Sequence, residues 1–182
     1  MPKGLAAGVR VGTLTKHMFV LGIDPGLTTT GYGVIEVAAG SIHPVSAGVI
    51  RTDPAAPVAT RLRDLHVDFT ALVHSIGVDE AAIEEVFVNR NLQTATAVGR
   101  AGGVVMLALA QTGVPVTEYT PSAVKLTVTG SGSADKEQVA RVVAMRLGLA
   151  TKPAPDDAAD ALAVALCHAQ AMPMRLAVER AR

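Results

Sequence analysis

Several carboxylates in this chain stand where an acid needs an explanation. Asp24 directly follows the apolar run 19–23, and Glu84 and Glu85 lie inside the apolar stretch 81–87. Burying a carboxylate is costly unless a partner or a metal ion compensates its charge. Asp24 would also suit a turn-forming role in Asp-Pro-Gly. Glu84 and Glu85 point to opposite faces of a strand, so periodicity leaves open which of them faces a site.

A second group of acids opens the last helix that the sequence predicts. Asp157 and Asp160 are three residues apart and would project from one helix face, where like charges repel unless a cation lies between them. Capping and compensation of the helix dipole explain an acid at Asp156 or Asp157. They explain Asp160 less well, because its neighbours are small and apolar.

Acids at the end of one strand, on another strand and at the start of a helix suit a hard divalent cation. Mg²⁺ takes oxygen ligands and keeps several waters for substrate phosphates. Two such ions roughly 4 Å apart can activate a water and stabilise the leaving oxygen of a phosphodiester. The five histidines show no paired zinc spacing, so we expect them to be surface or packing residues.

The elements that must position these acids follow from the apolar pattern. Short apolar runs predict strands, and the spacing of Val58, Leu62, Leu65, Phe69, Leu72 and Ile76 predicts an amphipathic helix that ends at Gly77. We expect strands at 19–23, 31–37, 41–50, 81–87 and 115–119, and helices at 58–76, 91–112, from 121, 135–147 and 156–171. This order predicts an α/β fold: a mixed five-stranded sheet, its first three strands antiparallel, flanked by helices.

Composition sets the outer limits of the interpretation. The 182 residues are 49% hydrophobic and 18% charged, which fits one folded domain, expected at 18–171 between tails at 1–17 and 172–182. Sixteen basic and sixteen acidic residues exclude binding of nucleic acid by bulk charge, although not a local basic face. The single cysteine, Cys167, fits a cytoplasmic protein. The run 101–110 is about half the length of a membrane span, so none is predicted.

Six segments, in order over about residues 18–170, resemble the RuvC family of Holliday-junction resolvases, which have an RNase H-like fold. They are Leu-Gly-Ile-Asp-Pro-Gly-Leu (21–27), Thr-Gly-Tyr-Gly-Val-Ile (30–35), Ile-Glu-Glu-Val-Phe (83–87), Val-Lys-Leu-Thr-Val-Thr-Gly (124–130), Ala-Asp-Lys-Glu-Gln-Val (134–139) and Asp-Ala-Ala-Asp-Ala-Leu-Ala (157–163).

The resemblance implies a role for individual residues. The four metal-binding catalytic carboxylates would be Asp24, Glu84, Asp157 and Asp160, which selects Glu84 over Glu85. They would hold one or two Mg²⁺ ions per subunit, with Mn²⁺ as the alternative. The DNA-binding residues would be Phe87, which stacks on unpaired bases at the crossover, together with Arg90, Lys125 and Lys136. Many relatives carry an arginine where this chain has Gly102, which leaves the role of nearby Arg100 open.

The resemblance also implies the reaction. Family members are homodimers that nick two opposed strands of a four-way junction symmetrically, leave 5′-phosphate and 3′-hydroxyl ends, and work with the RuvA–RuvB branch-migration motor. Two alternatives remain at this point. An actin-like or Hsp70-like ATPase begins with a similar Gly-Ile-Asp-x-Gly segment, but it needs a second lobe. A non-catalytic junction-binding module would not need four intact acids.

Overall fold

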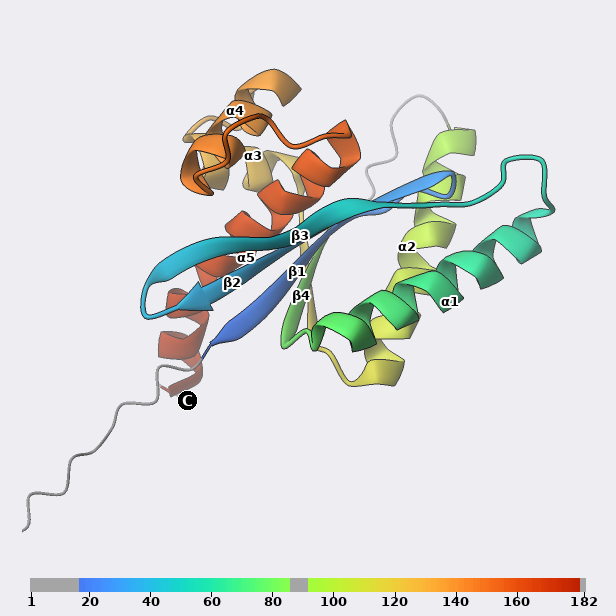
Figure 1. Ribbon diagram of the computed structural model, residues 1–182, viewed down its shortest axis with the longest axis horizontal. Coiled ribbons are helices and arrows are strands. Elements are labelled where there is room, and N and C mark those ends of the chain that lie inside the picture. Colours follow the sequence, from blue (N-terminus) through green and yellow to red (C-terminus); the bar gives the residue numbers. More distant parts are fainter. Residues whose placement is uncertain (1–16, 86–91, 181–182) are drawn as a thin grey trace, which may run out of the picture.

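A mixed sheet forms the centre of the molecule. The computed structural model describes residues 17–85 and 92–180. Five strands lie in the order β3-β2-β1-β4-β5, with helices on both faces (Figure 1). The strands are β1 (Met18–Asp24), β2 (Thr29–Ala38), β3 (Ser41–Arg51), β4 (Glu80–Glu84) and β5 (Val116–Tyr119). The helices are α1 (Val58–Ile76), α2 (Leu92–Thr112), α3 (Pro121–Thr129), α4 (Lys136–Arg146) and α5 (Asp156–Arg180).

The strand directions bring the ends of β1 and β4 together. β1 pairs antiparallel with β2, and β2 pairs antiparallel with β3, as the short connections predict. β1 pairs parallel with β4, and β4 pairs parallel with β5. Because Ile23 lies opposite Ile83, the residues that follow them, Asp24 and Glu84, end their strands side by side. The predicted α/β fold and its antiparallel start are confirmed.

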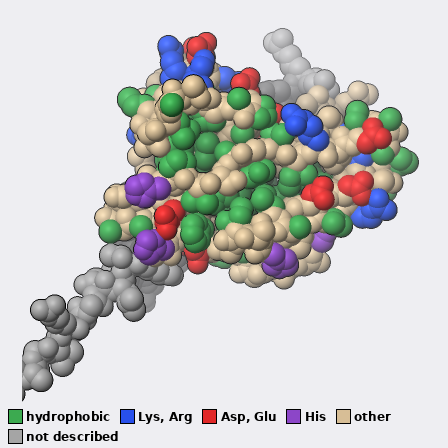
Figure 2. Space-filling model, in the orientation of Figure 1, with side chains coloured by type: hydrophobic (Ala, Val, Ile, Leu, Met, Phe, Trp, Pro, Cys, Tyr) green, Lys and Arg blue, Asp and Glu red, His purple; other side chains and the backbone are tan. Residues whose placement is uncertain are grey.

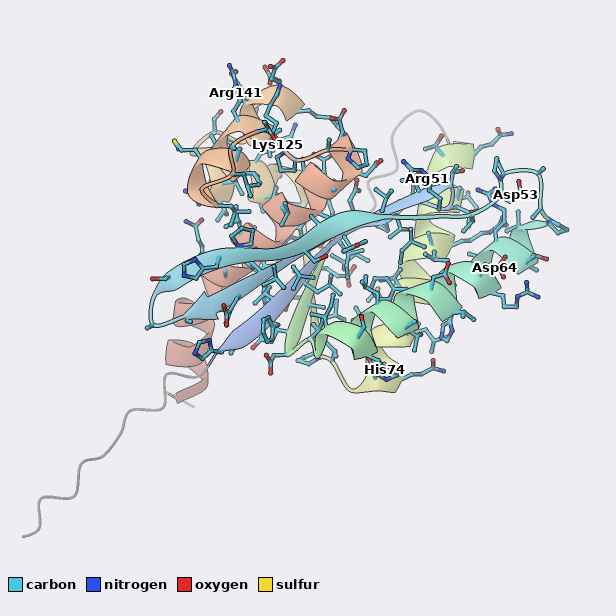
Figure 3. All side chains as sticks on the ribbon, in the orientation of Figure 1. Arg51, Asp53, Asp64, His74, Lys125 and Arg141 are labelled. Atoms are coloured by element: carbon cyan, nitrogen blue, oxygen red, sulfur yellow. The ribbon has the colours of Figure 1, made fainter. Side chains whose placement is uncertain are left out.

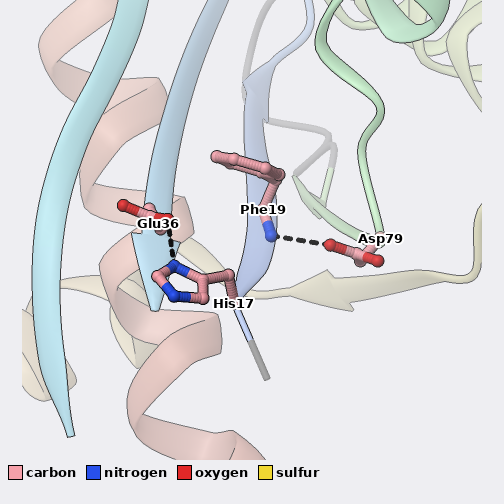
Figure 4. A network of polar contacts seen from close by, with 4 residues as sticks. All are labelled: His17, Phe19, Glu36 and Asp79. Atoms are coloured by element: carbon pink, nitrogen blue, oxygen red, sulfur yellow. Dashed lines mark hydrogen bonds and ion pairs between the residues drawn. The ribbon is translucent and has the colours of Figure 1, made fainter. Parts of the chain in front are cut away.

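The opposite end of the sheet is fixed by polar contacts. The backbone N–H of Phe19 donates a hydrogen bond to Asp79 Oδ2 over 2.8 Å, and His17 contacts the Glu36 carboxylate (Figure 4). The first contact ties β1 to the residue just before β4, and the second ties the start of β1 to β2. Both lie at the end of the sheet remote from Asp24, so they hold the register without occupying that edge.

Alternate residues of β1 belong to two separate cores. Val20 packs with buried residues of α3, α4 and α5, whereas Leu21 packs with buried residues of α1 and α2. The helices are therefore divided between the two faces of the sheet (Figure 1). On β4, Ala82 belongs to the α5 side and Ile83 to the α1 side. Since side chains alternate along a strand, Glu84 faces the α5 side together with Ala82.

Two helices test the sequence pattern at their ends. α1 covers the predicted residues and stops at Gly77, whose φ of 71° is left-handed and whose N–H bonds the Val73 carbonyl. α5 continues to Arg180, so the predicted end at about Ala171 was too early. The residues after Pro173 are mostly good helix formers, and the backbone stays helical through the proline.

Candidate active site

Carboxylates from three elements gather at the edge where β1 and β4 end. Asp24 and Glu84 are the last residues of those strands, and Asp157 and Asp160 lie in the first turns of α5. α5 approaches this edge closely: a Cβ on Gly31, the β2 partner of Asp24, would lie 2.0 Å from the Asp157 carbonyl oxygen. The absence of a side chain at Gly31 therefore lets the helix bring its acids to Asp24.

A cleft of about 190 Å³ collects most of the predicted site residues. Its charged lining is Asp24, Glu84, Lys125, Lys136 and Asp160. Lys125 projects from α3 (Figure 3). Lys136 lies at the start of α4, so the cleft lies between the sheet edge and these two helices. The fourth acid, Asp157, is not part of the lining, although its charge acts on Asp24.

Burial and crowding make Asp24 a weak acid. Burial is the main cause that raises the pKa of Asp24 to about 7, and the charges of Asp160, Glu84 and Asp157 raise it further, while Lys136 opposes them. The pKa of Glu84 is also raised, first by burial and then by Asp160, against the two lysines. Like charges at close range favour protonation, so this edge carries more negative charge than its own lysines neutralise.

Lys136 is the cation nearest the acids. Its Nζ donates a hydrogen bond to Asp160 Oδ2 over 2.7 Å, and that bond raises the pKa of Lys136. The helix start holds the lysine in place, because Asp135 and Gln138 form a capping box directly around it. The ammonium group thus sits where it partly neutralises Asp160, Asp24 and Glu84 together.

The donor set fits a hard cation better than a soft one. All the acids at this edge offer carboxylate oxygens, and the raised pKa of Asp24 is the property that a nearby cation would reverse. Within residues 17–85 and 92–180, however, no three His, Cys, Asp or Glu side chains stand close enough to ligate one ion. The Lys136–Asp160 bond holds one potential ligand, so side chains would rearrange when a cation enters.

The neighbouring acid, Glu85, lies elsewhere. It lines a second cleft, of about 410 Å³, together with Pro25, Gly99 and Met106, on the α2 side of β4. Glu84 borders both clefts. The structure therefore gives Glu84, and not Glu85, the position beside Asp24 and Asp160.

Sequence reasoning missed a buried network behind the site. His168 of α5 has no exposed surface; its Nε2 lies 2.8 Å from Glu80 Oε2 and its Nδ1 lies 3.1 Å from the Tyr119 hydroxyl. The network joins α5 to β4 and β5. Glu80 and Glu84 lie four residues apart on β4 and face the same side of the sheet, toward α5. That spacing is the only sign of the network in the sequence of the described residues.

Two of the four predicted DNA-binding residues fall outside the part of the chain that the structure describes. Phe87 and Arg90 lie outside the described residues, so base stacking by Phe87 and phosphate binding by Arg90 stay predictions. Arg100 is exposed on α2 and does not line the acidic cleft. Of the predicted DNA-binding residues that the structure describes, both Lys125 and Lys136 lie beside the acids.

A mixed sheet of this strand order, with a carboxylate-lined cleft between β1, β4 and the last helix, defines the RNase H-like class. Within that class, residues 20–168 match the family described as crossover junction endodeoxyribonuclease RuvC. The chain belongs to the RuvC family.

Relatives and solved structures agree with that assignment. RuvC of Chloroflexus aggregans is 49% identical over 156 residues, covering 86% of this chain and 95% of the relative. RuvC of Moorella thermoacetica is 48% identical over 158 residues, covering 87% and 95%. The structure of Thermus thermophilus RuvC in complex with a Holliday junction substrate superposes with a TM-score of 0.81 at 40% identity, covering 86% of this chain and 96% of that one.

Proposed function

We propose that this chain is a crossover junction endodeoxyribonuclease that cuts opposed strands of a Holliday junction by paired, symmetric nicks. The observation that carries the proposal is the meeting of Asp24, Glu84 and Asp160 with Lys125 and Lys136 in one cleft. A cleft with both carboxylates and lysines suits the hydrolysis of a phosphodiester bond. The products would carry a 5′-phosphate and a 3′-hydroxyl. An ATPase of the actin or Hsp70 type would not share a family with the relatives found here.

The four acids, Asp24, Glu84, Asp157 and Asp160, would hold one or two divalent cations, Mg²⁺ or alternatively Mn²⁺. When bound, such ions activate a water and stabilise the leaving oxygen. Asp24 must lose its proton before it can act as a ligand, because its pKa of about 7 leaves it partly protonated at neutral pH. The hydrogen bond between Lys136 and Asp160 must also break. The ammonium group of Lys136 is then free to contact the phosphate of the substrate.

The lysines give the cleft its second task, which is to hold the strand to be cut. Lys125 and Lys136 line the same cleft as the acids, from α3 and α4. A DNA strand brings one negative charge per phosphate toward carboxylates that would repel it. The two ammonium groups offset that repulsion at the point where the scissile phosphate must enter.

Replacing Asp24 by Asn tests the assignment. The change keeps the shape of the side chain and removes the charge, so we expect cleavage of a four-way junction to be lost while junction binding is retained. Asp68→Asn is the matched control, because Asp68 is exposed on α1, away from the cleft. Cleavage by Asp24→Asn at the wild-type rate would refute the role of Asp24.

The same proposal includes a homodimer that contacts its partner through α2. Over an 18-residue window, α2 has a mean hydropathy of 1.2 and is only 28% buried. Length and composition alone would also suit a membrane span, but α2 packs against α1 and one face of the sheet. Gly99, Gly103 and Leu107 follow at intervals of four and are all exposed, so they form one uncovered stripe.

A paired nick calls for a symmetric enzyme, and a twofold contact along this stripe would supply it. We expect sedimentation to show a dimer at micromolar concentration and Leu107→Asp to give monomers. Val67→Asp is the control, since Val67 is equally apolar and exposed on α1. A wild-type monomer that still makes paired nicks would contradict the dimer.

Cooperation with a RuvA–RuvB motor is proposed from family membership alone.

A further inference from the structure

Arg61 is a buried cation with no carboxylate partner among the described residues. It lies on α1 with 9% of its surface exposed. Its Nε donates to Thr52 Oγ1 over 3.0 Å, and its Nη2 donates to Thr28 Oγ1 over 2.7 Å. Both acceptors are neutral hydroxyls, and no ion pair involves Arg61 in residues 17–85 and 92–180. A buried charge is costly unless an opposite charge compensates it.

The outer edge of this guanidinium remains available. Its Nη1 bonds no described residue, yet it is not among the buried polar atoms that lack a partner, of which the described chain has only Thr70 Oγ1. Nη1 therefore reaches solvent. Thr28 is itself exposed, and its hydroxyl accepts from Arg61, so its own proton can be donated outward. Two donors thus stand side by side at the surface.

The fold holds both donors rigidly. Thr52 donates its hydroxyl proton to the Leu27 carbonyl over 2.5 Å, and its backbone N–H donates to the Thr28 carbonyl over 3.1 Å. The end of β3 thereby fixes the β1–β2 turn against Arg61. The first turn of α1 contains no acidic residue and no side-chain cap, so the positive end of the helix dipole lies unopposed beside the same group.

The position relative to the cleft suggests the ligand. Thr28 is four residues beyond Asp24, in the turn that follows β1, so the pair lies at the carboxylate edge but on the α1 side of the sheet. The net charge of the chain is zero. In the view of Figure 2, Lys and Arg side chains are scattered among Asp and Glu side chains and do not form one basic face. DNA contacts on such a protein must depend on individually placed cations.

We propose that Arg61 Nη1 and the Thr28 hydroxyl bind one backbone phosphate of the junction, on a strand next to the cleft. This rests on the proposed function, because it assumes that DNA crosses this edge. A guanidinium N–H donates a charge-assisted hydrogen bond to a phosphate oxygen, and a buried, pre-oriented guanidinium loses little entropy on binding. The phosphate supplies the negative charge that the folded chain does not.

Junction binding measured against salt concentration, in buffer without divalent ions, tests the proposal. Removing one phosphate contact should lower the slope of log K against log salt by about one. We expect this for Arg61→Gln, with affinity about tenfold lower at low salt, a change of about 1.4 kcal/mol. Arg63→Gln is the control, since Arg63 lies two residues on, is exposed and pairs with Asp64.

A second variant separates binding from folding, because Arg61 also ties three segments together. Thr28→Val keeps the shape of an exposed side chain and removes one hydroxyl, so it should weaken binding severalfold while lowering the melting temperature less than Arg61→Gln does. If Thr28→Val binds as the wild type does, or Arg61→Gln lowers the melting temperature without changing the salt slope, Arg61 is only a clamp and the proposal fails. A wild type that does not bind junctions would instead refute the proposed function.

Discussion

The two faces of the sheet are packed in opposite ways. On the α5 side, glycines of β1 and β2 let a helix touch the strands: a Cβ on Gly22 would lie 2.0 Å from the Ala161 carbonyl oxygen, and one on Gly33 would lie 2.7 Å from Leu162. On the α1 side, large side chains such as Phe69 and Leu109 fill the space between the layers.

Two glycines of α2, in contrast, are not in close contact with any other part of the subunit. A Cβ on Gly99 or Gly103 would meet nothing within 4 Å, so packing inside the subunit does not require them. Glycine in a helix lowers stability by about 1 kcal/mol relative to alanine, and no packing contact within the subunit compensates for this loss at Gly99 and Gly103. The close face serves to position acids, and the open face is free to meet something outside the subunit.

The largest expected effect comes from filling the close face. Gly31→Ala would drive a Cβ into the Asp157 carbonyl oxygen, which is backbone and cannot move aside cheaply. We expect a loss of more than about 3 kcal/mol of folding free energy, or failure to fold. Chemical denaturation measures it, and Gly99→Ala, where the same methyl group meets open space, is the control. Equal stability of both variants would remove the contrast between the faces.

The acids on the close face should make stability depend on pH. The folded-state pKa of Asp24, about 7, lies above its ordinary value of 3.8, so between these values the folded state binds more protons than the unfolded state. Stability from this group is present at low pH and is lost as pH rises toward 7. We expect the melting temperature of the metal-free protein to fall between about pH 4 and pH 7 and to level off above that.

Asp24→Asn sharpens that prediction, because it removes the titrating charge. The variant should melt higher than the wild type at pH 8 without metal, even though it cannot cleave. Added Mg²⁺ should raise the melting temperature of the wild type at pH 8 and have a smaller effect on the variant. A pH-independent difference between the two proteins would show that the charge of Asp24 does not limit stability.

A smaller effect is expected where α5 is tied to β4 and β5. His168→Leu removes a fully buried ring and the hydrogen bonds that it makes to Glu80 and Tyr119. We expect a loss of about 1–3 kcal/mol in denaturation. Tyr119→Phe keeps the ring, which stands edge-on to His168 at 5.8 Å, and should cost about 1 kcal/mol. A larger loss in Tyr119→Phe than in His168→Leu would place the stabilisation outside this network.

The sequence predicts best those features of the structure that are determined by residues close together in the chain. The apolar stripe and Gly77 fix α1 within the segment itself, and Asp24 is conspicuous because everything before it in the strand is apolar. The choice of Glu84 over Glu85 needed the resemblance, since Ala81 and Ala82 give no sign of which face is which. The structure resolves it because Ala82 and Ile83 enter different cores.

Long-range contacts were beyond pattern reasoning. His168 meets Glu80 across 88 residues, and Arg61 meets Thr28 across 33. Neither pair has a local spacing that marks it, because the sheet order and helix placement create the contact. The predicted end of α5 was wrong for a local reason: residues 172–182 were expected to form a tail, although most of them favour a helix, and α5 continues to Arg180.

The smallest expected effect concerns the open face. Gly103→Ala adds a methyl group that meets nothing within the subunit, so it should stabilise the monomer by up to about 1 kcal/mol through helix propensity. If the stripe of Gly99, Gly103 and Leu107 is the twofold contact, the same methyl group separates the two helices and weakens the dimer. Melting at low concentration and sedimentation over a dilution series measure the two effects separately. A more stable monomer together with a weaker dimer would locate the interface at Gly103. A more stable monomer with unchanged dimer affinity would show that the interface lies elsewhere on the molecule.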